Sequence, residues 1–486
     1  MSLLKNSSAL AVAGIVEYAA QLLLPVVLVR HLSVTEFGEY RLVWLVASTA
    51  LAIFPFFMPR TLFYFFPRLS GEARPRLIGN AALFLVVAGL LAGYLLWLTA
   101  ALMSEALATL VALHLTVPIF VALWVMASLF DSVAVADGRA ILQARATIVL
   151  SLVRTAALAG AAISIGDLAS LLLVMCVFAA VKFGLAIGYG AWIPKWQGIR
   201  GDWNLMRQQV TYAAPFAVGN ALYLLRGQAD QWVVASLFPA DVFALISIGA
   251  VVMGLANLVK QPMRNVILPP LGRSLAAEDT HRAAALVAHG NAAMIILLMP
   301  FLAWLFVCAP DLVSLVYTEA YRDAAPLMQL YIIGLAASVV GGGYLLAAFD
   351  AGRVALVISS TNLVLSIFLS YAGAHLVGLH GAVAGSIASL IIGEYWALMV
   401  IARKLDTSVW RLFEASLAVR AYGATSGAAA TALVGTYWWE GASVWRLLIG
   451  SISFLLSLAL FVVILRLHHD VRKLLDDLRA PLPNSI

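Results

Sequence analysis

Long apolar stretches, separated by short polar breaks, follow one another along almost the whole chain. A hydrocarbon core of roughly 30 Å needs about 20 apolar residues per helix, so stretches of this length predict transmembrane helices. We therefore expect an all-α integral membrane protein with about fourteen spans. The expected spans cover residues 8–30, 39–59, 78–101, 107–130, 141–164, 168–192, 210–237, 242–262, 285–308, 324–349, 354–375, 381–402, 415–438 and 443–466.

Composition supports this prediction. With 63% hydrophobic and 11% charged residues, a soluble multidomain protein is excluded, because so apolar a surface would aggregate. The sequence pI near 9.3 does not indicate a nucleic-acid partner, since the basic residues lie at helix ends rather than in one patch. Cys176 and Cys308 fall inside apolar stretches, so no structural disulfide is expected. The first stretch carries Glu17 and predicts a retained helix rather than a cleaved signal peptide.

Basic residues gather in alternate loops. Of the 30 Lys and Arg residues, 23 fall at the termini and in one set of loops. The opposite loops hold Arg30, Arg41, Arg322 and Arg446, and three further basic residues lie within spans. Positive charge accumulates on the cytoplasmic side of membrane proteins, so this bias predicts an even number of spans with both termini cytoplasmic.

The loop pattern repeats at an offset near 204. Met58-Pro59-Arg60 precedes a long basic loop at 60–77, and Pro262-Met263-Arg264 precedes another at 263–284. Two six-helix halves of equal orientation are expected, as in transporters built from parallel repeats. The predicted parts are an N-terminal lobe, a C-terminal lobe, two additional transmembrane helices and a cytoplasmic amphipathic tail, over residues 1–206, 207–403, 404–466 and 467–486. The tail could lie on the membrane surface or dock on the protein.

Several ordered segments resemble a known family. These are Val29-Arg30-His31-Leu32-Ser33-Val34-Thr35-Glu36-Phe37-Gly38-Glu39-Tyr40, Tyr64-Phe65-Phe66-Pro67-Arg68, Ala214-Pro215 with Asp230, Tyr317-Thr318-Glu319-Ala320-Tyr321-Arg322-Asp323-Ala324-Ala325, Asn362, and Gly378-Leu379-His380-Gly381-Ala382-Val383-Ala384. Together they resemble bacterial polysaccharide (O-antigen type) flippases. That family belongs to the multidrug/oligosaccharidyl-lipid/polysaccharide exporter superfamily, which also holds the toxic-compound exporters and the lipid II flippase.

The resemblance implies two pseudo-symmetric lobes around a central cavity in the bacterial cytoplasmic membrane. It also implies alternating-access flipping of an undecaprenyl-pyrophosphate-linked oligosaccharide for lipopolysaccharide or exopolysaccharide synthesis. The implied partners are this lipid-linked oligosaccharide, the phospholipid bilayer, and a proton or sodium as coupling ion. No cofactor, metal or nucleic acid is expected. The family's functional basic residues cannot be matched position by position, so the coupling ion stays open.

Six charged residues lie well inside predicted spans, away from the helix ends. A charge at mid-bilayer costs at least about 3 kcal/mol, so such residues should face a cavity or a partner. Arg226, Lys182 and Arg154, with Asn220 and Tyr223, are the candidate substrate-binding residues, because Arg and Lys bind phosphate. The candidate ion-coupling residues are Glu17, Asp230 and Glu394.

Structural roles compete with these assignments. Arg226 and Asp230 are four residues apart, so on one helix they would share a face and could neutralise each other. Lys182 could instead snorkel toward the inner boundary, and Glu394 could have a structural partner. Asp131, Asp137 and Asp350 are expected to be solvated at inner helix ends. The triplet Gly341-Gly342-Gly343 is expected within helix ten, permitting close packing or bending.

Two other functions remain open from sequence. A multidrug exporter of the same fold, coupled to a cation, should have an acidic and aromatic cavity, whereas three bases within the spans favour an anionic substrate. A membrane-embedded glycan polymerase or ligase is less well supported, because the outer loops are short. No catalytic motif, Walker-type loop or metal-binding spacing occurs in the sequence, so the protein is not expected to be an enzyme.

The charge distribution makes a testable topology prediction. Cysteines placed at Arg74 and Arg273 should react with a membrane-impermeant thiol reagent only from the cytoplasmic side, and one at Asp311 only from the outside. Labelling of position 74 from outside would overturn the model of fourteen spans.

Overall fold

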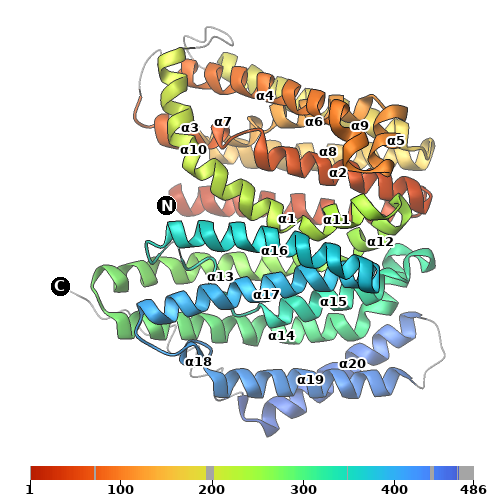
Figure 1. The fold of residues 1–486 in the computed structure, drawn as a ribbon, viewed down its shortest axis with the longest axis vertical. Helices are drawn as coiled ribbons and strands as arrows, with labels where there is room; N and C mark the ends of the chain where they lie inside the picture. The colour runs from red at the N-terminus through yellow and green to blue at the C-terminus, as the bar shows by residue number, and fades with distance from the viewer. Residues whose placement is uncertain are drawn as a thin grey trace. The chain divides into compact units, whose positions relative to one another are not determined.

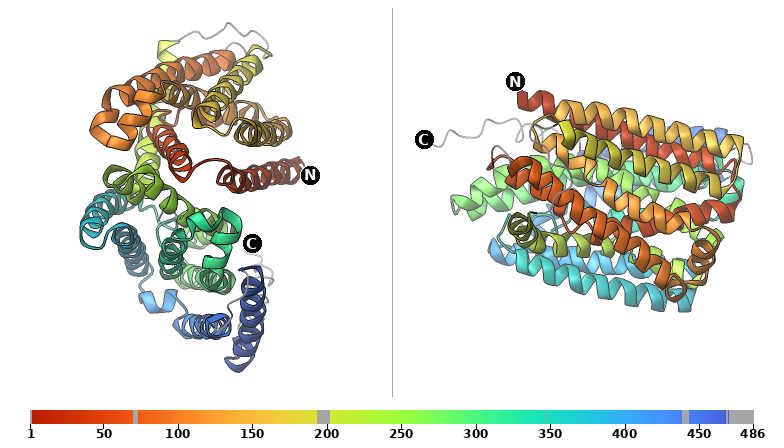
Figure 2. Two further views of the ribbon diagram at one scale, coloured as in Figure 1. Left: turned by 90° about the vertical axis from the view of Figure 1, so that its right-hand side faces the viewer. Right: turned by 90° about the horizontal axis from the view of Figure 1, so that it is seen from above.

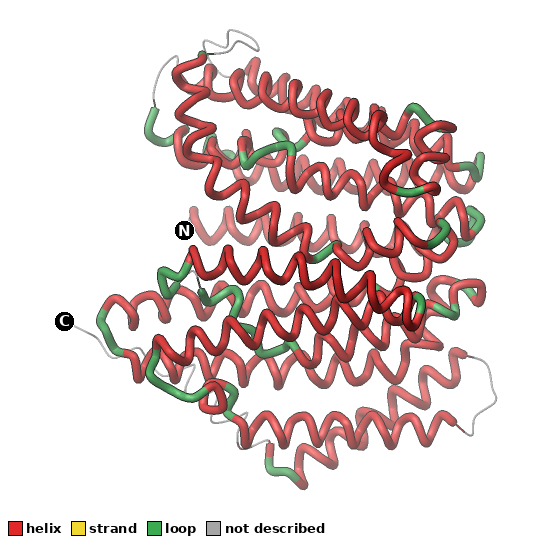
Figure 3. Tube along the Cα trace, viewed as in Figure 1, coloured by secondary structure: helices red, strands yellow, loops and turns green. Residues whose placement is uncertain are grey.

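The computed structural model describes residues 2–69, 73–192, 202–346, 348–437, 443–467 and 469. All regular secondary structure in these ranges is helical (Figures 1 and 3). The chain forms two compact units, Met1–Ala244 and Leu245–Ile486. Within each unit the axes of the long helices lie roughly along a common line, parallel or antiparallel to one another (Figure 2). The predicted fold class, an all-α integral membrane protein, is therefore confirmed.

The first unit contains eleven helices and the first half of a twelfth among its described residues. They are α1 (Ser2–Leu28), α2 (Val34–Ile53), α3 (Met58–Phe65), α4 (Ala73–Met103), α5 (Glu105–Leu113), α6 (Thr116–Ala127), α7 (Phe130–Ala136), α8 (Ala140–Ser164), α9 (Leu168–Trp192), α10 (Trp203–Arg226), α11 (Ala229–Leu237) and α12 (Ala240–Gly249). The start of α2 is set by a capping box, in which the Ser33 side chain accepts from the Glu36 amide and the Glu36 carboxylate accepts from the Ser33 amide.

The second unit contains the longest helix of the described chain, α14, which packs against α13, α15, α19 and α20. The helices that follow α12 are α13 (Val251–Ala276), α14 (Thr280–Tyr317), the short 3-10 helix η1 (Glu319–Tyr321), α15 (Ala324–Ala337), α16 (Gly352–Val377), α17 (Leu379–Lys404), α18 (Val409–Leu412), α19 (Ala415–Tyr437) and α20 (Ser443–Ile464). The predicted tail lies outside the described residues, apart from Leu467 and His469.

Ten helices of the described chain are long and apolar enough to cross a membrane, or eleven if the bent pair Val34–Ile53 and Met58–Phe65 is one span. Helices α10, α15 and α19 occupy three more of the predicted positions. Helix α15 is only 14 residues long, and α10 and α19 do not reach the same apolar character. The chain is thus a multi-pass membrane protein, while the count of fourteen stays a prediction.

Five predicted spans are interrupted helices. The fourth breaks at His114 and Leu115 and again at Ser128 and Leu129, and the eighth breaks at Ala250. The second breaks between α2 and α3, and the seventh breaks at Gly227 and Gln228, between α10 and α11. The tenth was expected to reach residue 349, but α15 ends at Ala337 and the described residues between 338 and 351 are not helical (Figure 3). The glycine triplet therefore lies outside a helix, contrary to prediction. An apolar stretch indicates that the segment lies in an apolar medium. It does not show whether the backbone is helical or is unwound with its amides and carbonyls hydrogen-bonded by other side chains.

The expected basic loop at 263–284 is also largely helical. Helix α13 continues through Pro262, Pro269 and Pro270 to Ala276, and α14 begins at Thr280. Lys260 and Arg264, which the loop assignment placed at the inner surface, therefore lie on α13 and contact other elements of the second unit. The three prolines misled the sequence analysis, because proline usually ends a helix but is tolerated in transmembrane helices.

Helices α10 and α11, which occupy the seventh predicted span, pack against α2 and α3 of the first unit. The Gln228 side chain donates to the Ser48 hydroxyl (2.9 Å) and accepts from Thr49 (2.8 Å), both on α2. The Trp232 indole donates to Thr49 (2.9 Å), and Tyr212 of α10 stacks on Tyr64 of α3. The unit therefore extends beyond residue 206. The predicted lobes were defined by internal repetition rather than by contacts, and they stay a prediction.

Helices α16 and α17 form a tight antiparallel hairpin around small residues. A Cβ atom at Gly373 would collide with the backbone of Gly381, and one at Gly385 with the backbone of Leu369. The Ser389 hydroxyl donates to the Asn362 carbonyl (2.9 Å). Small residues let two helix backbones approach closely, which is how transmembrane helices gain packing energy without a hydrophobic driving force.

The close packing at this hairpin gives a stability prediction. Gly381→Ala should lower the free energy of unfolding by about 1–3 kcal/mol, because the added methyl group overpacks the contact. Denaturant titration of the purified protein in detergent would measure the change. Gly184→Ala is the matched control, since nothing lies within 4 Å of a Cβ atom there. Equal stability of the two variants would contradict the packing model.

Candidate functional site

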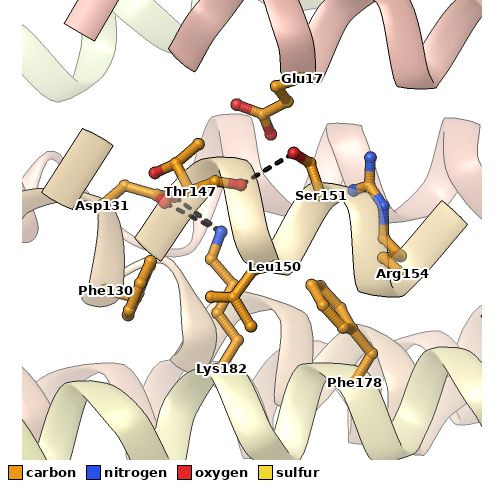
Figure 4. A pocket seen from close by; sticks show the side chains of 9 residues that line it. All are labelled: Glu17, Phe130, Asp131, Thr147, Leu150, Ser151, Arg154, Phe178 and Lys182. Carbon is orange, nitrogen blue, oxygen red and sulfur yellow. Dashed lines mark hydrogen bonds and ion pairs between the residues drawn. The ribbon is translucent and has the colours of Figure 1, made fainter. Parts of the chain in front are cut away.

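A charged pocket lies inside the first unit. Its lining comes from α1, α7, α8 and α9 and consists of Glu17, Phe130, Asp131, Thr147, Leu150, Ser151, Arg154, Phe178 and Lys182 (Figure 4). The enclosed space of the pocket is about 20 Å³. That is room for about one water molecule, so a larger group would have to enter through the open mouth or by movement of the lining side chains. The space suits a small charged group better than a saccharide.

Lys182 is held by an ion pair and by aromatic rings. Its Nζ lies 3.0 Å from each of the two Asp131 carboxylate oxygens. The same ammonium lies 5.2 Å from the ring centre of Trp124 and 5.7 Å from that of Phe130. The Lys182 side chain is 13% exposed, whereas that of Asp131 is 57% exposed. The carboxylate thus reaches solvent as expected, but it also neutralises a lysine inside the unit, which the sequence analysis missed.

Arg154 is the most buried cation of the pocket, at 7% exposure. Its guanidinium carbon lies 6.0 Å from the ring centre of Trp44 and 5.8 Å from that of Phe178. The buried Nε atom has no hydrogen-bond partner among the described residues. A buried donor without a partner costs free energy, so an anion that supplies an acceptor would bind here favourably.

Glu17 brings a carboxylate to the pocket from α1, which packs along α8. It extends toward Thr147 and Ser151 of α8 (Figure 4). The Ser151 hydroxyl donates to the Thr147 carbonyl (2.8 Å). Two cations and two carboxylates therefore line one small space. The pocket can bind an anion at its cations and change its net charge when a carboxylate takes up a proton.

The structure divides the predicted site residues into three places. Glu17, Arg154 and Lys182 meet at the pocket. Asn220, Tyr223 and Arg226 lie on α10 and are not among the residues that line the pocket. The Asn220 and Tyr223 side chains are exposed, and the Arg226 guanidinium carbon lies 5.8 Å from the Tyr223 ring centre.

Asp230 is buried on α11 and accepts from the Gln231 amide (2.9 Å). The helix break at Gly227 and Gln228 separates Arg226 from Asp230. The assumed i to i+4 spacing on one helix face is therefore wrong. The roles proposed for both residues stay predictions.

Glu394 contacts the unwound stretch of the second unit. Its Oε2 accepts from the Gly343 amide (3.0 Å). Lys260 donates from Nζ to the Ser338 carbonyl (3.4 Å), and the Arg264 guanidinium lies 5.0 Å from the Tyr344 ring centre. Lys260 and Arg264 were not predicted as site residues, because both were assigned to the positive charge of the loop that follows the eighth span. Their position within an otherwise apolar run was the available signal.

Metal ligation finds little support in the described part of the chain. No group of three or more His, Cys, Asp or Glu residues there could hold a metal ion. Both cysteines are free and buried. Asp137, expected to be merely solvated, accepts from the Tyr189 hydroxyl (2.6 Å) and pairs with Arg139 (3.2 Å). The ionisable chemistry of the described residues is thus that of ion pairs and hydrogen bonds.

Solved structures share this fold. The chain is similar to lipid II flippase MurJ in an inward closed conformation (TM-score 0.71, 12% identity, 94% of this chain and 99% of that chain). It is also similar to a multidrug resistance MATE family transporter of the MOP superfamily in an inward-facing conformation (TM-score 0.67, 13% identity, 80% and 96%). A MOP superfamily transporter from Pyrococcus furiosus gives a TM-score of 0.52 at 12% identity, covering 83% and 97%. At these identities the likeness shows the fold alone.

Sequence comparison identifies the family. No curated protein matches the chain. The model of the family described as "Polysaccharide biosynthesis protein" matches residues 3–275, which is more than half of the sequence and includes the whole pocket. The resemblance found in the loop motifs is thereby confirmed at the level of the family. The chain belongs to the polysaccharide biosynthesis protein family.

Proposed function

We propose that the protein is a secondary transporter that flips an undecaprenyl-pyrophosphate-linked oligosaccharide across the bacterial cytoplasmic membrane by alternating access. Family membership and the shared fold of a lipid II flippase support a lipid-linked substrate. The observation that carries the proposal is the buried Arg154, whose Nε lacks a partner beside Lys182 in a small pocket. A pyrophosphate supplies the acceptor oxygens that such a site lacks.

The two cations would act differently. Arg154 is held by aromatic rings rather than by a carboxylate, so its planar fork is ready to bind two phosphate oxygens. Lys182 is neutralised by Asp131, and a phosphate must compete with that carboxylate for the ammonium. Exchange of Lys182 between Asp131 and the substrate would make binding reversible, which a transporter needs in order to release its cargo.

Glu17 is the proposed coupling residue of this pocket. Its carboxylate repels an anion when ionised and tolerates one when protonated, so proton uptake and substrate binding would favour each other. Arg226 of α10 remains a candidate for a second substrate contact, and Asp230 of α11 remains a candidate for a second coupling residue. The cytoplasmic position of both termini and the central cavity between two lobes belong to the same proposal.

A multidrug exporter of the same fold is the second candidate. The observation that favours it is the aromatic surroundings of the pocket, where Trp44, Trp124 and Phe178 could receive an organic cation beside Glu17. The two functions differ in the sign of the substrate charge. Neutralising Arg154 should weaken the transport of an anionic lipid but not that of a cationic drug.

Charge removal in the pocket gives the main test. Arg154→Gln and Lys182→Gln should each lower flipping of the lipid-linked oligosaccharide at least about tenfold, because each removes a charge-assisted hydrogen bond worth about 1.5–3 kcal/mol. The measurement is translocation of a labelled lipid-linked oligosaccharide in proteoliposomes. Arg353→Gln, an equal charge change at an exposed helix start in the second unit, is the control. Full transport by well-folded Arg154→Gln would contradict the proposal.

The two last helices test how the long lipid tail is accommodated. An undecaprenyl chain gains nothing by leaving hydrocarbon, so it should stay in the bilayer while the headgroup crosses. We propose that α19 and α20 border a groove for this tail. Deleting residues 415–486 should abolish flipping while the remaining helices still insert, since the cut preserves the bond from Asn291 to the Leu412 carbonyl (2.9 Å). Translocation and membrane insertion are measured together.

The control for this truncation is deletion of residues 470–486 alone, which leaves α20 complete. It should transport at the rate of the full chain. If the 415–486 deletion inserts and flips the long-chain lipid at the full rate, the groove assignment is wrong.

A further inference from the structure

In each unit, an ionisable side chain in the middle of a helix forms a hydrogen bond with a residue about fifty positions earlier in the chain. In the first unit Lys182 of α9 binds Asp131 of α7, and in the second Glu394 of α17 binds the Gly343 amide. Both pairs are separated by 51 residues. The first unit therefore has a cation where the second has a carboxylate. The partner in the second unit is not a side chain but the backbone of an interrupted helix.

The Glu394 carboxylate replaces a helical acceptor. In a continuous α-helix, the Gly343 amide would donate to the carbonyl four residues earlier, at Val339. Here the carbonyl's place is taken by Glu394 Oε2 at 3.0 Å. A hydrogen bond to an ionised acceptor is roughly twice as strong as one between neutral groups, so the carboxylate stabilises the unwound form.

Glycine is required for this close approach to α17. A Cβ atom at Gly341 would lie 2.8 Å from Glu394 Oε2, and one at Gly342 would lie 2.6 Å from the Leu398 backbone nitrogen. A side chain at Gly342 would therefore push the stretch away from the α17 backbone, whereas one at Gly341 would displace the Glu394 carboxylate. The glycine triplet and the carboxylate form one arrangement, in which the backbone lies directly on the facing helix.

Cationic and hydroxyl groups secure both ends of the stretch. Lys260 donates to the Ser338 carbonyl (3.4 Å), and Lys404 donates to the Phe349 carbonyl (3.0 Å). The Tyr422 hydroxyl donates to the Ala336 carbonyl (2.5 Å). The middle is held by Glu394, which is only partly buried and so accessible to protons. A change at this one residue would act on the middle while the ends stay attached.

The elements near Glu394 carry mostly basic side chains and one other carboxylate. Arg264 and Glu394 both lie within electrostatic range of the Tyr344 hydroxyl. The titratable or charged groups on the stretch and on α13, α15, α16 and the end of α17 are Tyr344, Asp350, Lys260, Arg264, Arg273, Tyr331, Arg353, Tyr371, His375, Arg403 and Lys404. Most are cations or neutral at pH 7, and the one other carboxylate, Asp350, is exposed at the far end.

We propose that Glu394 is a proton-binding latch. When ionised, it holds the backbone around Gly343 unwound against α17, and when protonated, it releases that backbone. Uptake of the proton removes the charge that strengthens the hydrogen bond and places a competing hydrogen on the carboxyl group. The latch is a property of the second unit and does not depend on the identity of the transported molecule.

Hydrogen–deuterium exchange of the full-length protein in detergent tests the latch without any substrate. After correction for intrinsic rates, backbone exchange within residues 338–351 should rise severalfold as the pH falls from about 8 to about 4, through the ordinary range of a glutamate carboxyl group. Glu394→Gln should show the faster exchange at both pH values, because its neutral amide mimics the protonated acid. Exchange in α19 serves as the internal reference.

Glu414→Gln is the matched control. Glu414 pairs with His289 (3.5 Å) in the same unit but does not contact the stretch, so this variant should keep the pH response of the unmodified protein. No pH response of residues 338–351 in the unmodified protein would overturn the latch, even if Glu394→Gln does not fold. Equal or slower exchange in folded Glu394→Gln would overturn it as well. A transport defect in the pocket variants bears only on the proposed function.

Discussion

The need to satisfy polar groups in an apolar medium governs this structure. In hydrocarbon an unpaired backbone amide or carbonyl costs several kcal/mol, so the chain forms helices wherever it meets lipid. At two interruptions a polar side chain joins the broken segment to a neighbouring element. Gln228 binds the Ser48 and Thr49 side chains at the break between α10 and α11, and Glu394 accepts from the Gly343 amide at the break after α15.

The same constraint explains where the charges lie. Lys182 is tolerated within a span because Asp131 and two aromatic rings surround its ammonium. Arg154 is surrounded mainly by aromatic faces, which attract a cation but leave its Nε donor unused. A buried cation that is held but not fully hydrogen-bonded is poorly explained by packing alone. It is well suited to an anionic ligand that comes and goes.

The last two helices pack on α14 through small apolar clusters, and α20 adds polar contacts. Arg446 of α20 pairs with Asp311 (3.2 Å), and the Trp304 indole donates to Ser451 (3.0 Å). Helix α20 buries little beyond Gly450 and Phe454, so most of its apolar surface is uncovered by the described chain. This surface is suited to contact with lipid.

The sequence by itself determined the membrane class, the family and which charges require an explanation. Apolar length and the absence of charge are local properties, so the long spans and the intramembrane residues Glu17, Arg154 and Lys182 could be found without a structure. Which of these residues meet depends on the packing of α1, α8 and α9. Helical continuity across Pro262 and its loss at Gly341-Gly342-Gly343 were also decided by tertiary contacts, because a backbone in lipid keeps or leaves the helix according to the partners that neighbouring elements supply.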